Sequence, residues 1–195
     1  MSFEAREVEA HHQPAESLEL ADPRAMRALA HPTRLALLEH LHLEGPATAT
    51  QCGEAIGESP ASCSYHLRAL ARWGLVEEAP GGKGRQRPWR MAARSISFSS
   101  APGSADQLAA ASLLRREVLA RDERVVREFF EHEAELPEEW REAASLGNGV
   151  LYLTLQELDE VVTRVRTVLQ DFDRRERPAG ARRVDLLFRA LPRRG

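Results

Sequence analysis

The residues best suited to chemistry lie between Ser59 and Val76, where a short capped helix is followed by a strand. The Ser59 hydroxyl can accept from the free backbone N–H groups of the first turn, and Pro60 suits a first helical position, which needs no N–H. Gly74 can take the left-handed conformation that stops the helix. We therefore predict a helix over 60–73 that offers polar side chains to a ligand.

The segment after this helix is rich in glycine and cations. Residues 81–90 read Gly-Gly-Lys-Gly-Arg-Gln-Arg-Pro-Trp-Arg, in which the glycines permit a hairpin tip and the cations suit a phosphate backbone. Residues 59–94 hold seven cations against two acids, a net of +5, whereas residues 1–21 have a net of −4 and the whole chain −3. The positive charge is therefore local, and the pattern predicts a basic wing beside the helix.

One face of the predicted helix carries the candidate DNA contacts. Helical spacing places Ala61, Ser62, Tyr65 and Arg68 opposite the apolar residues Cys63, Leu67 and Leu70. Arg68 has the donors for a guanine contact, and Tyr65 and Ser62 can bond phosphate or base. The wing residues Lys83, Arg85, Gln86 and Arg87 would add salt-dependent backbone contacts or insert into the minor groove. The alternative is that these polar residues form a solvated helix face.

Three earlier helices are expected to position this element. Asp22-Pro23 caps a short helix over 24–30, and His31-Pro32 opens a second one that Gly45-Pro46 ends. Thr48 and Gln51 form a capping box for a third helix over 49–56, which Gly57 stops. The turn between Gly57 and Pro60 is short, as in a helix-turn-helix. We therefore assign residues 21–94 to a winged helix-turn-helix domain.

The flanking regions differ in character. Residues 1–20 show no apolar periodicity and are expected to be a mobile tail. Residues 95–105 are rich in serine and include Gly103, which indicates a linker or an irregular strand. Residues 106–135 contain no glycine or proline and predict a long helix. Helices over 138–144 and 155–172, with strands over 150–154 and 183–191, then predict a small α+β domain within 106–195.

Composition limits the function classes. No apolar run approaches the roughly 20 residues that span a bilayer, and the acidic N-terminus is unlike a signal peptide, so we expect a cytoplasmic, nucleoid-associated protein with no membrane partner. The two cysteines, Cys52 and Cys63, are too few for a disulfide framework. The chain lacks a phosphate-binding glycine loop, a nucleophile elbow and a His-Glu-x-x-His motif, so we expect no enzyme activity and no cofactor.

The segment Ala-His-Pro-Thr-Arg-Leu at 30–35, with His-Leu-x-x-Leu at 66–70 and Gly-Leu-Val at 74–76, resembles the ArsR-like branch of bacterial winged helix-turn-helix transcription regulators. The resemblance covers about residues 22–92. It implies a homodimer on a palindromic operator, with the helix at 60–73 in the major groove and the wing at 80–90 on the backbone or minor groove. It also places His66, of the family's His-Leu pair, at the edge of the reading face.

The family's usual metal sites are not reproduced in this chain. Members that sense metals use a Cys-x-Cys pair near the third helix, or Asp-x-His with a distant His-x-x-Glu on the long helix. Here the third helix holds Cys52 alone, and His132 and Glu135 have Leu119 and Arg121 at the matching upstream positions, which cannot ligate. We therefore expect no metal site.

The overall prediction is a mainly α protein with small β content. It combines the winged helix-turn-helix, a long dimerisation helix and a C-terminal α+β domain whose aromatic residues form either a core, which we favour, or a site for a small apolar effector. The expected function is sequence-specific binding of double-stranded DNA by a homodimeric repressor. The alternative is a winged-helix protein-interaction module without DNA binding. The predicted DNA contacts are Ser59, Ala61, Ser62, Tyr65, His66, Arg68, Lys83, Arg85, Gln86 and Arg87.

Overall fold

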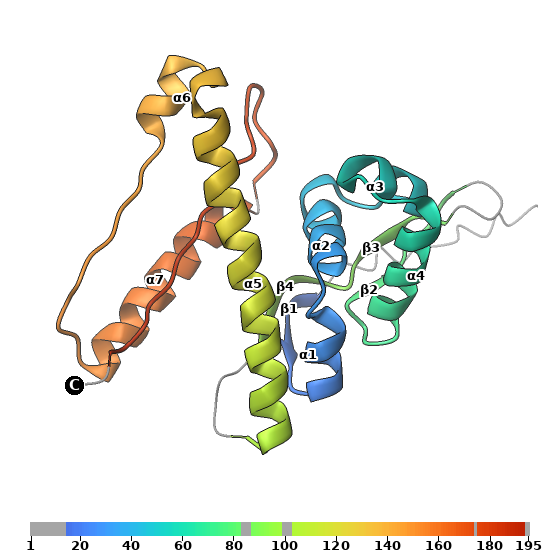
Figure 1. Cartoon of the computed structure of the whole chain (residues 1–195), viewed down its shortest axis with the longest axis horizontal. Coiled ribbons are helices and arrows are strands. Elements are labelled where there is room, and N and C mark those ends of the chain that lie inside the picture. Colours follow the sequence, from blue (N-terminus) through green and yellow to red (C-terminus); the bar gives the residue numbers. More distant parts are fainter. Residues whose placement is uncertain (1–14, 83–86, 99–102, 174, 194–195) are drawn as a thin grey trace, which may run out of the picture. The chain divides into compact units, whose positions relative to one another are not determined.

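A computed structural model describes residues 15–82, 87–98, 103–173 and 175–193 of the chain. The chain divides into two compact units, residues 1–121 and residues 122–195. Figure 1 labels the helices and strands along the chain.

The first unit is built mainly of helices, with two small sheets. Its elements in chain order are β1 (Ala15–Leu20), α1 (Pro23–Leu29), α2 (Pro32–Glu44), α3 (Ala49–Ile56), α4 (Pro60–Ala71), β2 (Val76–Glu78), β3 (Trp89–Met91), β4 (Ala93–Phe98) and α5 (Ala105–His132), of which α5 ends in the second unit. The expected order of helices before the wing is confirmed.

Local side-chain caps explain where these helices begin. The Asp22 carboxylate accepts from the backbone N–H of Arg24 at 2.8 Å, which opens α1. Thr48 and Gln51 form the predicted capping box at α3, because the hydroxyl of Thr48 accepts from the N–H of Gln51 and the amide oxygen of Gln51 accepts from the N–H of Thr48. Gly57, at φ +72°, ends α3 in the left-handed conformation.

The core of the first unit lies where α2, α3 and α4 meet. The largest side chains below 2% exposure in these helices are Leu37, Cys52, Cys63, Leu67 and Leu70. Leu75 and Val76 after α4, and Leu114 of α5, join the same cluster. Burial of this apolar surface is the main force that holds the three helices together. The inward face of α4 predicted from the sequence is therefore confirmed for Cys63, Leu67 and Leu70.

Two small sheets flank the helices. β2 and β3 pair antiparallel with Val76 opposite Met91, and Ala47 bridges to Trp89 on the other side of β3. β1 pairs parallel with β4 from Ala15 opposite Ala93 to Leu20 opposite Phe98. The prediction of a mobile tail over 1–20 is therefore wrong for residues 15–20, because β4 supplies backbone partners and Leu20 is buried in the core. Residues 95–98 of the expected linker belong to β4, which agrees with the strand alternative.

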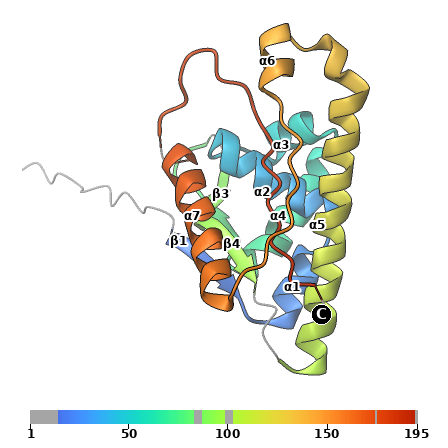
Figure 2. The same cartoon turned by 90° about the vertical axis from the view of Figure 1, so that its left-hand side faces the viewer.

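The second unit contains the end of α5, the 3-10 turn Glu133–Glu135, α6 (Glu138–Ala143) and α7 (Leu155–Asp173). Thr154 and Glu157 form the predicted capping box at the start of α7. Extended segments lead into and away from α7 (Figure 2). Neither segment is a strand: residues 150–154 and the described residues of 183–191 pair with no other part of this unit that the structure describes. The predicted α+β domain is therefore wrong in its strands.

The aromatic residues of the second half do not form a core within the chain. None of Phe129, Phe130, Trp140, Tyr152, Phe172 and Phe188 is buried, and Tyr152 is fully exposed. The preferred expectation of an aromatic core is therefore wrong for the single chain. Among the residues that the structure describes, no helix is both long and apolar enough to cross a bilayer.

Candidate nucleic-acid interface

Helix α4 begins at the residues whose chemistry predicted its start. The hydroxyl of Ser59 accepts from the backbone N–H of Ser62 at 3.1 Å, and Pro60 occupies the first turn. The turn before it packs closely, because a Cβ on Gly53 would lie 2.5 Å from the carbonyl oxygen of Glu58. Gly74 has φ +66° and turns the chain into β2. The sequence therefore fixes both ends of the helix locally.

The predicted contact face of α4 points away from the core. Ser59, Ala61, Tyr65 and Arg68 are exposed, with Tyr65 at 64% exposure, and Ser62 is half-buried. Cys63, Leu67 and Leu70 lie on the opposite side and are buried. A tyrosine so exposed on a helix that is otherwise well packed is available to a ligand.

Arg72 was missed by the sequence reasoning and belongs to the same stripe. It lies seven residues after Tyr65 and four after Arg68, and it is exposed. Neither Arg68 nor Arg72 makes an ion pair within the described parts of the chain, so both guanidinium groups keep their donors for an external partner. The i+4 spacing from Arg68 is the signal that could have revealed it.

Cross-strand ion pairs stiffen the base of the wing. Arg90 donates to Glu77 at 2.8 Å between directly opposed residues of β3 and β2, and Arg87 donates to Glu78 at 2.8 Å. Arg87 nevertheless keeps most of its side chain exposed. The other predicted wing contacts, Lys83, Arg85 and Gln86, lie outside the described residues.

Residues 29–79 match a family described as a helix-turn-helix domain. The chain contains a helix-turn-helix domain. This match covers α2, α3 and α4, and it confirms the helix-turn-helix predicted from the sequence. The resemblance to ArsR-like regulators noted in the sequence lies in the same part of the chain. A comparison with curated proteins finds no match.

Solved structures similar to the chain include a winged helix-turn-helix domain and two regulators. One is a homodimeric winged helix-turn-helix DNA-binding domain from Mycobacterium bovis, described as a possible ArsR-family transcriptional regulator, with 24% identity over 54% of this chain and 77% of that one, at a TM-score of 0.32. A transcriptional regulator homologue from Pyrococcus horikoshii has 19% identity over 50% and 87%, at 0.31. A MarR family regulator from Neisseria meningitidis has 18% identity over 72% and 79%, at 0.32.

His66 occupies a different place in the helix-turn-helix domain from the one predicted. It is buried, and its Nδ1 accepts from Nε of Arg34 at 3.2 Å while its ring lies 4.5 Å from the ring of His31. A guanidinium can only donate, so Nδ1 is unprotonated. Burial, followed by the charges of His31 and Arg34, lowers the pKa of His66. His66 therefore links α4 to α2, and we remove it from the candidate DNA contacts.

The cysteines of the helix-turn-helix domain are poor metal ligands. Cys52 and Cys63 are both fully buried, and burial raises the pKa of the Cys52 thiol to about 11 and also raises that of Cys63. A cysteine binds a metal as its thiolate, and such burial disfavours the thiolate. The described residues contain no group of three or more His, Cys, Asp or Glu side chains that could hold a metal ion.

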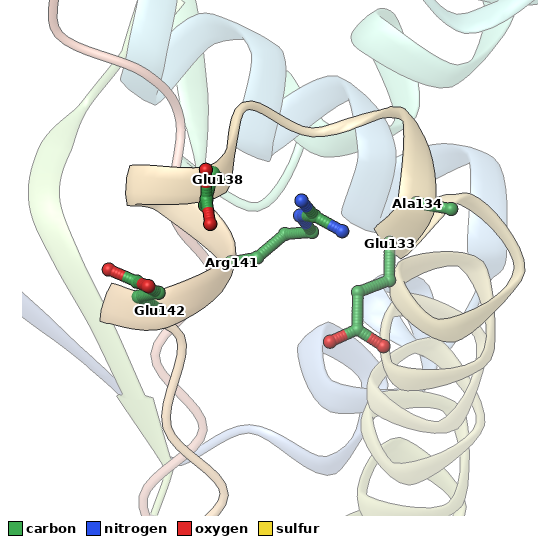
Figure 3. Close-up of a pocket in the computed structure, with 5 residues that line it drawn as sticks. All are labelled: Glu133, Ala134, Glu138, Arg141 and Glu142. Carbon is green, nitrogen blue, oxygen red and sulfur yellow. The ribbon is translucent and has the colours of Figure 1, made fainter.

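A hollow in the second unit is charged. Figure 3 shows its lining: Glu133 and Ala134 from the turn after α5, with Glu138, Arg141 and Glu142 from α6. Three carboxylates and a guanidinium do not form the apolar surroundings that an apolar effector needs. The hollow therefore lends no support to the expected effector site.

Proposed function

We propose that this chain is a sequence-specific DNA-binding transcription regulator that acts as a repressor and binds a palindromic operator as a homodimer. The observation that carries the proposal is the outward stripe on α4, where Ala61, Tyr65 and Arg68 are exposed on a helix whose other face is buried in the core. An α-helix of this kind fits the major groove of B-DNA, and in a helix-turn-helix the second helix does so.

Each residue of the stripe has a proposed role. Arg68 donates two hydrogen bonds to a guanine, which is the commonest base-specific contact of an arginine. Tyr65 and Ser62 bond a phosphate or a base edge, and Ala61 allows close approach or contacts a thymine methyl group. Ser59 lies at the N-terminus of α4, where a phosphate is favoured by the free N–H groups and the helix dipole. Arg72 extends the stripe on α4 and bonds a phosphate of the DNA backbone.

The wing adds affinity mainly through contacts to the DNA backbone. Lys83 and Arg85 neutralise phosphates, and Gln86 bonds the backbone or a minor-groove edge. Arg87 is paired with Glu78 but largely exposed, so its remaining donors reach a phosphate. The ion pairs of Arg87 with Glu78 and of Arg90 with Glu77 support this proposal, because they hold the strands at the base of the wing in register.

Two copies of the chain are proposed to bind together, with α5 contributing to their interface. The exposed apolar residues Leu108, Leu113 and Leu119 of α5 support this proposal. Paired recognition helices would then read two half-sites about one helical turn apart.

The test is selection of a binding sequence from random duplex DNA, followed by affinity measurement on the selected site. We expect log affinity to fall steeply with log salt and Arg68→Ala to cost about 1–3 kcal/mol on the selected site. Arg141→Ala, an arginine of α6 in the second unit, is the matched control and should leave the affinity unchanged. Selection that yields no sequence, with no salt-dependent binding, would instead favour a protein-interaction module.

A further inference from the structure

The second unit exposes far more apolar surface than a self-contained domain does. Among the described residues of 122–195 no apolar side chain is buried, and fourteen large ones are exposed: Phe130, Leu146, Val150, Leu151, Tyr152, Leu153, Leu155, Val168, Phe172, Val184, Leu186, Leu187, Phe188 and Leu191. At about 100 Å² each, these side chains expose on the order of 1,000 Å² of apolar surface in total, distributed along the unit. This surface is comparable with the ~800 Å² that each partner buries in a standard protein interface.

Helix α7 shows what kind of partner fits this surface. Its apolar residues recur at spacings of three and four, as in a coiled-coil seam: Leu155, Leu158, Val162, Val165, Leu169 and Phe172. The outer members, Leu155 and Phe172, are exposed, and the inner four are only half-buried. The seam therefore keeps apolar surface that a second helix could cover.

The seam is symmetric about its own midpoint. Reversing the helix exchanges Leu155 with Phe172, Leu158 with Leu169, and Val162 with Val165, because each pair lies at equal distance from the centre of α7. An antiparallel second copy therefore meets every layer of the seam with a large apolar side chain. The seam of α7 can therefore be paired fully by the α7 of a second copy, without a different partner protein.

The residues that flank the seam favour the same arrangement. On one side of the seam, Asp159 and Arg166 are seven residues apart. In an antiparallel pair, Asp159 of each copy lies nearly opposite Arg166 of the other, so two such charge pairs form. On the opposite side, Val161 and Val168 extend the apolar surface. A parallel pair would instead bring these charges against the valines, since opposite flanks face each other in that arrangement.

We propose that α7 pairs antiparallel with α7 of a second copy, and that this contact completes the fold of the second unit. The proposal rests on the proposed homodimer and assigns part of its interface to α7. In this arrangement the second copy also covers the exposed apolar residues beside α7.

The decisive experiment is a charge exchange in the full-length chain without DNA. Sedimentation velocity at about 0.5–50 µM should show a concentration-dependent dimer. Asp159→Arg and Arg166→Asp should each weaken the dimer about tenfold by placing like charges opposite each other, and the double variant should recover to within about threefold of the wild type. Asp171→Arg, the same charge reversal outside the seam and its flanks, is the matched control and should not change the dimer constant.

Three results would overturn the proposal: a monomer over the whole range, single variants that sediment like the Asp171→Arg control, or a double variant no better than the singles. Circular dichroism of each variant shows whether the helix content is retained. A second substitution, Leu155→Glu, places a charge at an exposed residue of the single chain and should weaken the dimer while leaving the helix content unchanged.

Failure of this proposal is distinguishable from failure of the DNA-binding proposal. Arg68→Ala should weaken binding to the selected site about 5- to 150-fold and leave sedimentation unchanged. A chain that dimerises through α7 but selects no DNA sequence would refute the regulator proposal alone.

Discussion

Replacement of Gly53 by alanine tests whether the helix-turn-helix domain depends on the close approach between α3 and the turn that follows it. Gly53 is buried within α3, and an added Cβ would lie 2.5 Å from the carbonyl oxygen of Glu58, whereas ordinary contacts begin near 3.4 Å. Helix propensity alone predicts that Gly53→Ala stabilises the helix by about 1 kcal/mol. The overlap is with backbone and cannot be relieved by a side-chain rotation, so we assign it a cost of about 3 kcal/mol.

The net expectation is a loss of about 2 kcal/mol in the free energy of unfolding, measured by chemical denaturation with tryptophan fluorescence. Ala55→Gly, at an exposed position of the same helix, is the control and should lose about 1 kcal/mol through propensity alone. Opposite substitutions in one helix are thus both expected to destabilise it. If Gly53→Ala were as stable as the wild type or more stable, the close approach would not constrain the turn and the reasoning would be refuted.

Three further measurements test the domain. Burial lowers the pKa of His66, so the contribution of neutral His66 to stability should be complete above about pH 6.5 and lost as the pH falls towards the lowered pKa. Chemical denaturation at about pH 7.5 and 5.5 should show this loss of unfolding free energy. His66→Gln should make the loss between the two pH values smaller. Thr48→Ala should cost about 1 kcal/mol of unfolding free energy by removing the capping box with Gln51, and an unchanged denaturation midpoint would contradict this role. Arg72→Ala should lower the slope of log DNA affinity against log salt by about 1, whereas Arg90→Ala should act mainly on wing stability because Arg90 is paired with Glu77.

Features set by neighbouring residues were predictable from the sequence. The capping boxes at Thr48 and Thr154 and the cap at Ser59 depend on contacts within three residues, so their patterns located the starts of α3, α7 and α4. The exposed face of α4 was also predictable, since helical periodicity separates Tyr65 and Arg68 from Leu67.

Features that depend on distant partners were not predictable in the same way. Residues 15–20 form a strand because β4 pairs with them across 78 positions, and nothing near Ala15 signals that partner. The alternation at 150–154 and 183–191 has strand character, yet a strand needs a neighbour, and the described part of the chain provides none for either segment. His66 lies at the edge of the helical face by spacing, but Arg34 and His31 cover it.

The parallel pairing of β1 with β4 decides how a minimal fragment of this protein should be cut. A fragment of residues 21–94, which the sequence pattern suggests as a domain, would remove all of β1 and divide β4 after Arg94. Its remaining edge would be two residues long, and the apolar surface that Leu20 covers would open to water. Fragments intended for crystallisation or spectroscopy should therefore begin upstream of Ala15 and extend past Phe98.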